Sequence, residues 1–209
     1  MTATYDAVLF DLDGVLTSTG ALHAACWKRV FIKQTDVVLA TYLVGHHFSE
    51  QEKRRTFDYY DPLTTGDSTL SAFIQSVVAS EVGYPEAALE YFVHACAVDL
   101  ADVHGNTADG IHIASCGGTW LALVAGFGGL REDDGDVCFH PRLPDDWDRL
   151  RFRVQVRGQV VEVDMTHEAT TYRLVDGRGI QVGHFDERVR LLPGAPVMCS
   201  QPGEQRRAA

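Results

Sequence analysis

Cysteine is scarce in this chain of 209 residues, and its pattern excludes two common roles. The five cysteines are scattered, odd in number and form no C-x-x-C pair. This usage predicts neither a disulfide framework nor a zinc site, and it is typical of the reducing cytosol. A basic segment followed by an apolar one, which would mark the chain for export, is also lacking at its start. We therefore expect a cytoplasmic protein.

Long apolar runs and excess positive charge are lacking as well. The longest apolar run, around Trp120–Leu130, falls well short of the ~20 residues that a membrane span needs. The formal net charge of −11 argues against a nucleic-acid partner and against an anionic membrane surface. It does not exclude a phosphorylated ligand, because local fields decide that. Hydrophobic residues make up 45% of the chain and charged residues 22%, so we expect a packed core.

The first half of the chain has the patterns of helices. A helix is predicted over residues 32–43, and a capping box at Ser49–Glu52 opens a second. Apolar residues spaced near 3.6 predict a third helix between a cap at residues 67–69 and Gly83. Pro85 stands where a fourth helix would begin, since proline is welcome in a first turn.

The stretch Asp109–Leu130 predicts a further helix, with Asp109 as its N-cap and a glycine cluster as its end. His112 and Ser115 are three residues apart near its start, so they would be neighbours on one face. Such groups near a helix N-terminus suggest a contact with phosphate or sugar. The alternative is a buried helix whose histidine satisfies a hydrogen bond of the core. Spacing alone favours this alternative.

After the glycine cluster the pattern changes from helical to strand-like. Apolar and polar residues alternate over residues 150–157 and again over 161–165, with a tight turn at Gly158. Further short strands, separated by Gly/Asp turns, are predicted at residues 170–174, 180–182 and 189–192. The fold class is therefore mainly α followed by an antiparallel β domain. We expect the polar tail from Pro196 to be disordered.

Two carboxylates follow a short apolar run near the start of the chain. Ala7–Phe10 predicts a buried strand, and Asp11 and Asp13 come directly after it. The two side chains could share a Mg²⁺ ion, with one attacking phosphorus and the other moving a proton. The alternative is an Asp-rich junction between a strand and a turn. The whole run favours the first interpretation.

This D-x-D-G-V-L run resembles the first motif of the haloacid dehalogenase superfamily of phosphatases and phosphomutases. Thr19, His23 and Trp27 follow at spacings similar to those in β-phosphoglucomutase. The resemblance implies Asp11 as nucleophile and Asp13 as general acid/base. It stops near Val30, and the later motifs of the superfamily are not found beyond it.

A second resemblance, to the C-terminal part of glycoside hydrolase family 65, covers about three quarters of the chain. It extends from Lys33 to about Pro193 and is carried by K-Q-T-D-V-V-L, F-S-E-Q-E-K-R-R-T-F-D-Y-Y-D-P-L-T-T-G-D-S-T-L-S, D-G-I-H-I-A-S-x-G-G-T-W-L-A-L-V-x-G-F-G-G-L-R and P-R-L-P. The resemblance implies the last helices of an (α/α)₆ barrel and a C-terminal β domain. The expected layout is a dehalogenase-like strand–helix fragment (residues 1–30), barrel helices (31–132), the β domain (133–195) and a disordered tail (196–209).

The family 65 resemblance also implies a chemistry. In that family phosphate attacks the anomeric carbon of an α-glucoside and inverts it, and inorganic phosphate is a co-substrate with no other cofactor. Lys33 and Gln34 match contacts to the glucosyl hydroxyls. The family usually shows His-Asp-Ser-Ser where this chain has G-D-S-T at residues 66–69. The positions that match phosphate contacts are His112, Ser115, Ser68 and Thr69.

The general acid of the family is a glutamate that precedes the position of Lys33, and the resemblance finds no counterpart here. We expect Glu81, Glu86 and Glu90 to be ordinary surface charges. The leading hypothesis is a truncated family 65 protein, inactive alone, whose exposed helix faces favour self-association. The alternatives are a Mg²⁺-dependent phosphatase or phosphomutase, with Mg²⁺ held by Asp11 and Asp13, and a non-catalytic sugar-binding remnant. Expected partners are sugar and phosphate, not nucleic acid or membrane.

Overall fold

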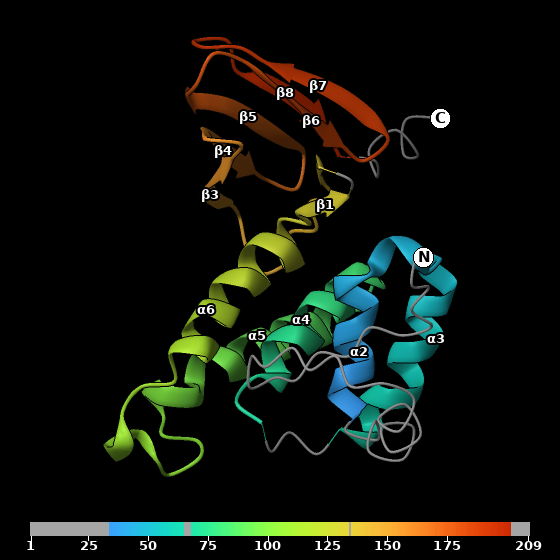
Figure 1. The fold of residues 1–209 in the computed structure, drawn as a ribbon, viewed down its shortest axis with the longest axis vertical. Coiled ribbons are helices and arrows are strands. Elements are labelled where there is room, and N and C mark those ends of the chain that lie inside the picture. The colour runs from blue at the N-terminus through green and yellow to red at the C-terminus, as the bar shows by residue number, and fades with distance from the viewer. Residues whose placement is uncertain (1–33, 65–67, 134, 202–209) are drawn as a thin grey trace, which may run out of the picture.

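The computed structural model describes residues 34–64, 68–133 and 135–201. Two regions follow one another along the chain: a helical region over residues 34–127 and a β region over residues 131–200. In Figure 1 the β region lies at one end of the helices, and α6 extends toward it. The predicted order, helices before strands, is confirmed. That the helices belong to an (α/α)₆ barrel remains a prediction.

Two helices begin where the sequence predicts them. Ser49 caps α3 through a complete capping box with Glu52, and Pro85 occupies the first turn of α5, as expected. The helices are α2 (Gln34–Leu43), α3 (Glu50–Tyr60), α4 (Ser71–Glu81), α5 (Pro85–Leu100) and α6 (Ile113–Leu121). Shorter 3₁₀ turns are η1 (Gly45–His47), η2 (Asp61–Leu63) and η3 (Thr107–Asp109), and the π-helix η4 (Ala122–Phe127) continues α6.

One predicted helix start is wrong, and another lies further along the chain than predicted. Asp109 does not cap α6, because it lies in η3 and the glycine that follows it has a φ of 127°, which breaks the helix there. The residue before α6 is His112. Helix α4 begins at Ser71, directly after Leu70, and not directly after residues 67–69, although the Ser68 hydroxyl accepts from the Leu70 backbone N–H at 3.2 Å.

Helices α4 and α6 run parallel and in close contact. Gly118 of α6 lies against the Phe73 ring of α4, so closely that a Cβ atom there would overlap the ring. Further along, the Ser80 hydroxyl donates to the Gly126 carbonyl at 3.1 Å. Residue numbers therefore rise together along the two helices, and their N-terminal ends lie at the same end of the helical region.

Helix α5 runs in the opposite direction to α4. Ser76 of α4 donates to the Ala88 carbonyl of α5 at 2.8 Å, whereas Thr69 and Val98 line one small cavity. The C-terminal end of α5 consequently lies beside the N-terminal ends of α4 and α6. Buried aliphatic residues of α4 hold this arrangement, and Val77 and Val78 are fully buried.

The β region consists of two four-stranded sheets with a core between them. The first has the order β1-β2-β6-β7 and the second β3-β4-β5-β8. Their core includes the fully buried Phe139, Val161, Val163, Tyr172 and Leu191. The strands are β1 (Arg131–Asp133), β2 (Asp136–Phe139), β3 (Leu150–Val156), β4 (Gln159–Met165), β5 (Ala169–Asp176), β6 (Ile180–His184), β7 (Glu187–Leu191) and β8 (Val197–Ser200).

Two predictions about the β region need correction. The pairing is not wholly antiparallel, because β2 and β6 are parallel neighbours. The tail is not disordered from Pro196, because β8 pairs with β5 and buries Cys199. Strand β8 has only four residues, and so short an alternation of apolar and polar residues is too weak a pattern to predict a strand. Strand β1 begins at Arg131, two residues before the expected start of the β domain at residue 133.

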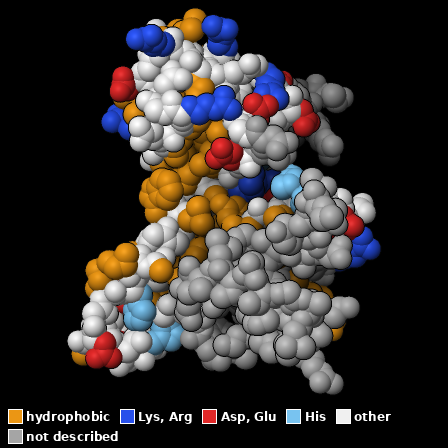
Figure 2. All heavy atoms as spheres, in the orientation of Figure 1, with side chains coloured by type: hydrophobic (Ala, Val, Ile, Leu, Met, Phe, Trp, Pro, Cys, Tyr) orange, Lys and Arg blue, Asp and Glu red, His pale blue; other side chains and the backbone are white. Residues whose placement is uncertain are grey.

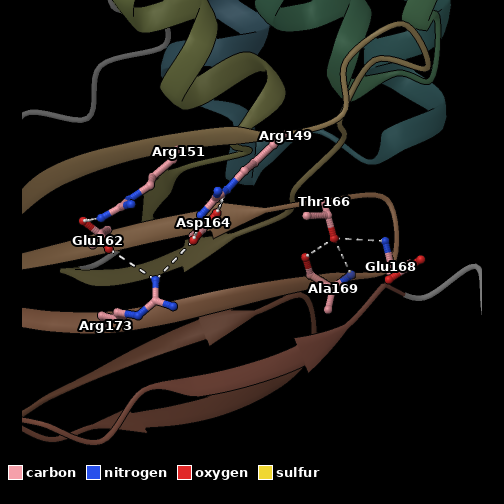
Figure 3. A network of polar contacts seen from close by, with 8 residues as sticks. All are labelled: Arg149, Arg151, Glu162, Asp164, Thr166, Glu168, Ala169 and Arg173. Carbon is pink, nitrogen blue, oxygen red and sulfur yellow. Dashed lines mark hydrogen bonds and ion pairs between the residues drawn. The ribbon is translucent and has the colours of Figure 1, made fainter.

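A charge network covers the outer face of the second sheet (Figure 3). Glu162 and Asp164 stand on β4 and are only 3% and 8% exposed. Arg149 donates to both carboxylate oxygens of Asp164, at 2.6 and 2.7 Å. The remaining donors come from the neighbouring strands: Arg151 and Arg153 to Glu162, and Arg173 to both carboxylates.

In the described part of the chain, no helix combines the length and the apolar character that crossing a membrane requires. The cytoplasmic location expected from the cysteine pattern stays a prediction.

Candidate functional site

Polar side chains gather where the N-terminal ends of α4 and α6 meet the C-terminal end of α5. A cavity of about 110 Å³ opens between α4 and α5, and Ser68 and Thr69 line it together with Gln75, Tyr91 and His94. Two of the predicted phosphate contacts thus lie in one cavity. The other two, His112 and Ser115, stand at the start of α6.

His112 is held firmly by Asp99, the penultimate residue of α5. The His112 ring Nδ1 donates to Asp99 Oδ1 at 2.6 Å, and its backbone N–H donates to Asp99 Oδ2 at 2.9 Å. The bond from His112 keeps the pKa of the Asp99 carboxyl below its usual range. On the other side of the ring, Nε2 lies 3.3 Å from Asn106 Nδ2. Because Nδ1 faces a carboxylate, the imidazole keeps one orientation and presents Nε2 away from Asp99.

Ser115 lies in the first turn of α6, and its surroundings are unusual. It is only 2% exposed, and its hydroxyl has no hydrogen-bond partner among the described residues. Only two other buried side-chain atoms in this part of the chain share that property, His104 Nε2 and Asn106 Oδ1. All three belong to residues 104–115. A buried unpaired polar group costs about 1–3 kcal/mol, so this end of α6 has polar groups that a ligand would satisfy.

The cavity wall beside Ser68 and Thr69 contains groups that sequence reasoning missed. Asp61 accepts hydrogen bonds from Gln75 Nε2 at 2.8 Å and from the Tyr91 hydroxyl at 2.9 and 2.8 Å. Burial, followed by the bond to Asp61, raises the pKa of Tyr91 well above its ordinary value, so this phenol stays a neutral donor. Asp61 lies in the D-P-L-T-T-G run of the block that resembles family 65, but nothing in that run indicates that its carboxylate contacts Gln75 and Tyr91.

Ser68 itself is exposed, and its hydroxyl accepts from the Leu70 backbone N–H at 3.2 Å. Thr69 is partly buried. Both hydroxyls lie at the N-terminal end of α4, the end toward which the backbone N–H groups of the helix point. An anion near this end would also meet the favourable ends of two helix dipoles, those of α4 and α6.

Several predicted residues lie outside the described residues: Asp11, Asp13, Thr19, His23, Trp27 and Lys33. Gln34 is the first residue of α2, and its side chain is not described. The conditional Mg²⁺ site at Asp11 and Asp13 therefore stays untested. Within residues 34–64, 68–133 and 135–201, no group of three or more His, Cys, Asp or Glu side chains is placed to hold a metal ion.

Among the three glutamates expected on the surface, the prediction is wrong for Glu81. Its side chain is 14% exposed and pairs with both Lys53 and Arg131. It ends α4 and faces the β region, which the helical period alone does not reveal. Glu86 and Glu90 are exposed, as predicted.

Comparison with known proteins places the chain in a family. A model of the glycosyl hydrolase family 65 central catalytic domain matches residues 19–121, and a model of the C-terminal domain of that family matches residues 130–191. The chain therefore belongs to glycosyl hydrolase family 65. The catalytic-domain match begins before the expected start at residue 31. It thus includes part of the segment that resembles a haloacid dehalogenase fragment, and the matches give that resemblance no support.

Its relatives include phosphorylases of several disaccharides. The chain is 41% identical over 168 residues to the α,α-trehalose phosphorylase of Thermoanaerobacter brockii, covering 80% of this chain and 22% of that protein. It is 35% identical over 169 residues to the maltose phosphorylase of Bacillus subtilis, covering 79% and 22%. A solved structure, a putative kojibiose phosphorylase from the human microbiome, superposes with a TM-score of 0.74 at 25% identity and covers 79% and 23%. The chain thus spans under a quarter of each relative's length.

Proposed function

We propose that this chain provides the phosphate-binding part of a family 65 active site, in which an α-glucosidic disaccharide reacts with inorganic phosphate. The observation that carries the proposal is the buried, unpaired hydroxyl of Ser115 beside His112, at the N-terminal end of α6. The printed names of the relatives, trehalose, maltose and kojibiose phosphorylases, support the same class of reaction. The particular disaccharide is left open.

In this proposal His112, Ser115, Ser68 and Thr69 hold the phosphate. Their hydroxyl and imidazole groups donate to its oxygens, and the ends of α4 and α6 add a favourable field. Asp99 has a positioning role, because its carboxylate fixes the orientation of the imidazole. Lys33 and Gln34 are proposed to contact the glucosyl hydroxyls.

The reaction is a substitution at the anomeric carbon. A phosphate oxygen forms a bond to that carbon while the bond to the leaving sugar oxygen breaks, and the configuration inverts. A general acid must give a proton to the leaving oxygen, and the family resemblance assigns this to a glutamate that precedes the position of Lys33. What the described residues supply is the alignment of the nucleophile. Phosphate is a co-substrate, and no other cofactor is proposed.

The test combines a binding measurement with a turnover measurement on the whole chain. Calorimetric titration with inorganic phosphate should show saturable binding that His112→Ala weakens at least tenfold and that Glu90→Gln, an exposed control on α5, leaves unchanged. Incubation with trehalose, maltose or kojibiose plus phosphate reports whether glucose 1-phosphate forms, and any turnover should be lost in His112→Ala. A folded chain that binds no phosphate and produces no glucose 1-phosphate would contradict the proposal.

Self-association is proposed through exposed apolar side chains of α5, of α6 and of Ile111 just before α6. Large side chains there are strongly exposed, and Figure 2 shows hydrophobic side chains (orange) along α6. They are Leu100 (90%), Ile113 (69%), Ile111 (65%), Val93 (57%) and Trp120 (51%). A second copy of the chain would cover this face. Sedimentation should show concentration-dependent association that Ile113→Ser reduces, and a monomer at all concentrations would contradict it.

A further inference from the structure

A second and larger cavity lies at the opposite end of α4 from the candidate phosphate site. Its volume is about 370 Å³, and it is lined by the end of α2, the start of α3, the end of α4 and the first residues of the β region. Glu81, the last residue of α4, is about 15 Å along the helix from Ser71, its first. In Figure 2, Lys or Arg and His side chains are visible between the β region and the helices.

The inner wall of this cavity has more positive than negative charge. Three carboxylates line the cavity, and only that of Glu81 is partly buried. Each of its two oxygens already forms an ion pair. Lys53 Nζ lies 2.5 Å from Oε1, and Arg131 Nη2 lies 2.9 Å from Oε2. The other two lining carboxylates, Glu50 and Glu132, are exposed residues of the rim.

Arg131 is fixed in place by further contacts. Its Nη1 donates to the Ala125 carbonyl at 2.6 Å and to the Leu130 carbonyl at 2.8 Å. Its guanidinium also lies over the Tyr42 ring, 5.1 Å from the centroid. The cation therefore needs no further partner to hold its geometry, and it forms one rigid wall of the cavity.

Arg142 is the lining cation that forms no ion pair among the described residues. Among the described residues no carboxylate lies within salt-bridge distance of it, and its one side-chain bond is from Nη1 to the His140 carbonyl at 3.1 Å. Burial, and then the nearby Arg131, lower the pKa of Arg142, and the charges of Glu81 and Glu50 oppose this shift only in part. Its other N–H donors have no partner in the described part, yet they are not buried away from solvent. As far as the described residues show, these donors can bind a ligand in the cavity.

Lys53, Arg131 and Arg142 thus contribute three positive charges, and of the three carboxylates that line the cavity only Glu81 lies on its inner wall, where Lys53 and Arg131 already occupy it. Partly buried charge without compensation is costly, and a bound anion would remove that cost. The volume falls in the range of about 300–1,000 Å³ that is usual for small-molecule sites. We propose that this cavity binds a small oxyanion, a phosphate- or carboxylate-bearing molecule, with Arg142 as its principal contact. The site is separate from the candidate phosphate site at the other end of α4.

The test uses the whole chain with His112→Ala, so that the α6 site contributes little. Titration of this variant with inorganic phosphate, and separately with citrate, at low ionic strength should show saturable binding of at least one of them. Adding Arg142→Gln should weaken it at least tenfold, whereas adding Arg190→Gln, an exposed arginine on β7, should leave it within twofold. Preference for phosphate or for citrate then separates the two ligand chemistries. Binding that Arg142→Gln does not change, or no binding of either probe, would overturn the proposal.

A second measurement covers the case in which Arg142→Gln does not fold. In the unaltered chain, phosphate or citrate should shift the backbone amide resonances of Gly45 and Arg142 during an NMR titration. Shifts confined to residues 112–115 would overturn the proposal while leaving the proposed function intact. Shifts at Gly45 and Arg142 alone would support it and contradict the proposed function.

Discussion

The outer face of the second sheet and the N-terminal end of α6 bury polar groups to a similar extent. They differ in whether those groups have hydrogen-bond partners. Glu162 is 3% exposed and accepts from Arg151, Arg153 and Arg173. Ser115 is 2% exposed and has no partner among the described residues. A buried group that is fully paired stabilises the fold, whereas a buried group that is left unpaired costs stability until something binds it.

The difference follows from how each region is built. Strands β3, β4 and β5 are neighbours, so arginines on the outer strands reach the carboxylates of β4 from both sides, and the network is complete without a ligand. The end of α6 has its histidine fixed by Asp99 but leaves the Ser115 hydroxyl unsatisfied. We therefore expect the sheet face to contribute to stability, and the unsatisfied helix end agrees with the binding role that we propose for it.

The largest effect is expected where α6 touches α4, because that contact places the two helix ends together. In Gly118→Ala the new methyl group would overlap the Phe73 ring, and overpacking of this kind costs about 2–3 kcal/mol. Urea denaturation should show this loss. The matched control is Gly117→Ala, whose Cβ meets nothing within 4 Å. It should gain about 0.5–1 kcal/mol, because alanine is the better helix former. Equal stability of the two variants would refute the close contact.

A smaller loss is expected from the sheet network. Glu162→Gln removes the charge that three half-exposed arginines share, and we expect it to lower the free energy of unfolding by about 1–2 kcal/mol. Phosphate binding should not change, because the network has no ligand role. Glu168→Gln, an exposed residue of the following turn, is the control and should change stability by less than about 0.5 kcal/mol.

The same network predicts how stability depends on pH. Hydrogen bonds from Arg151 and Arg149 hold the pKa values of Glu162 and Asp164 below their usual range. Groups with depressed native pKa values contribute fully above their unfolded values and lose the contribution as pH falls through the native ones. Stability should therefore decline below about pH 4, with a shallower decline in Glu162→Gln. Identical pH profiles for the two proteins would show that this carboxylate is not responsible.

The smallest effects compare two buried serines directly. The Ser80 hydroxyl donates to the Gly126 carbonyl, so Ser80→Ala should cost about 1 kcal/mol. The Ser115 hydroxyl donates to nothing in the described residues, so Ser115→Ala should leave stability unchanged or slightly raise it. Thermal denaturation of both variants measures the contrast. A clear loss in Ser115→Ala would mean that the hydroxyl has a structural partner.

The sequence predicted most elements for local reasons. The capping box at Ser49, the proline at the start of α5 and the alternation of β3 and β4 each depend on neighbouring residues, and the structure confirms all three. Predictions failed where distant residues decide. The burial of Glu81 depends on Lys53 and Arg131, which no helical period reveals.

The candidate site could be predicted only in part. His112 and Ser115 were identified by spacing and then by the family 65 resemblance, but spacing favoured a structural role. The partners that fix the site, Asp99 for the imidazole and Tyr91 for Asp61, come from α5. Their contribution depends on the antiparallel packing of α5 against α4, which is a property of the fold and not of any local motif.

The most direct test of the central claim is phosphate binding by Ser115→Ala, measured by calorimetry together with its stability. Our account predicts that the variant is as stable as the unaltered chain and binds inorganic phosphate at the α6 site at least tenfold more weakly, since the hydroxyl is there for a ligand and not for the fold. Unchanged phosphate affinity, or weaker binding accompanied by an equal loss of stability, would contradict it.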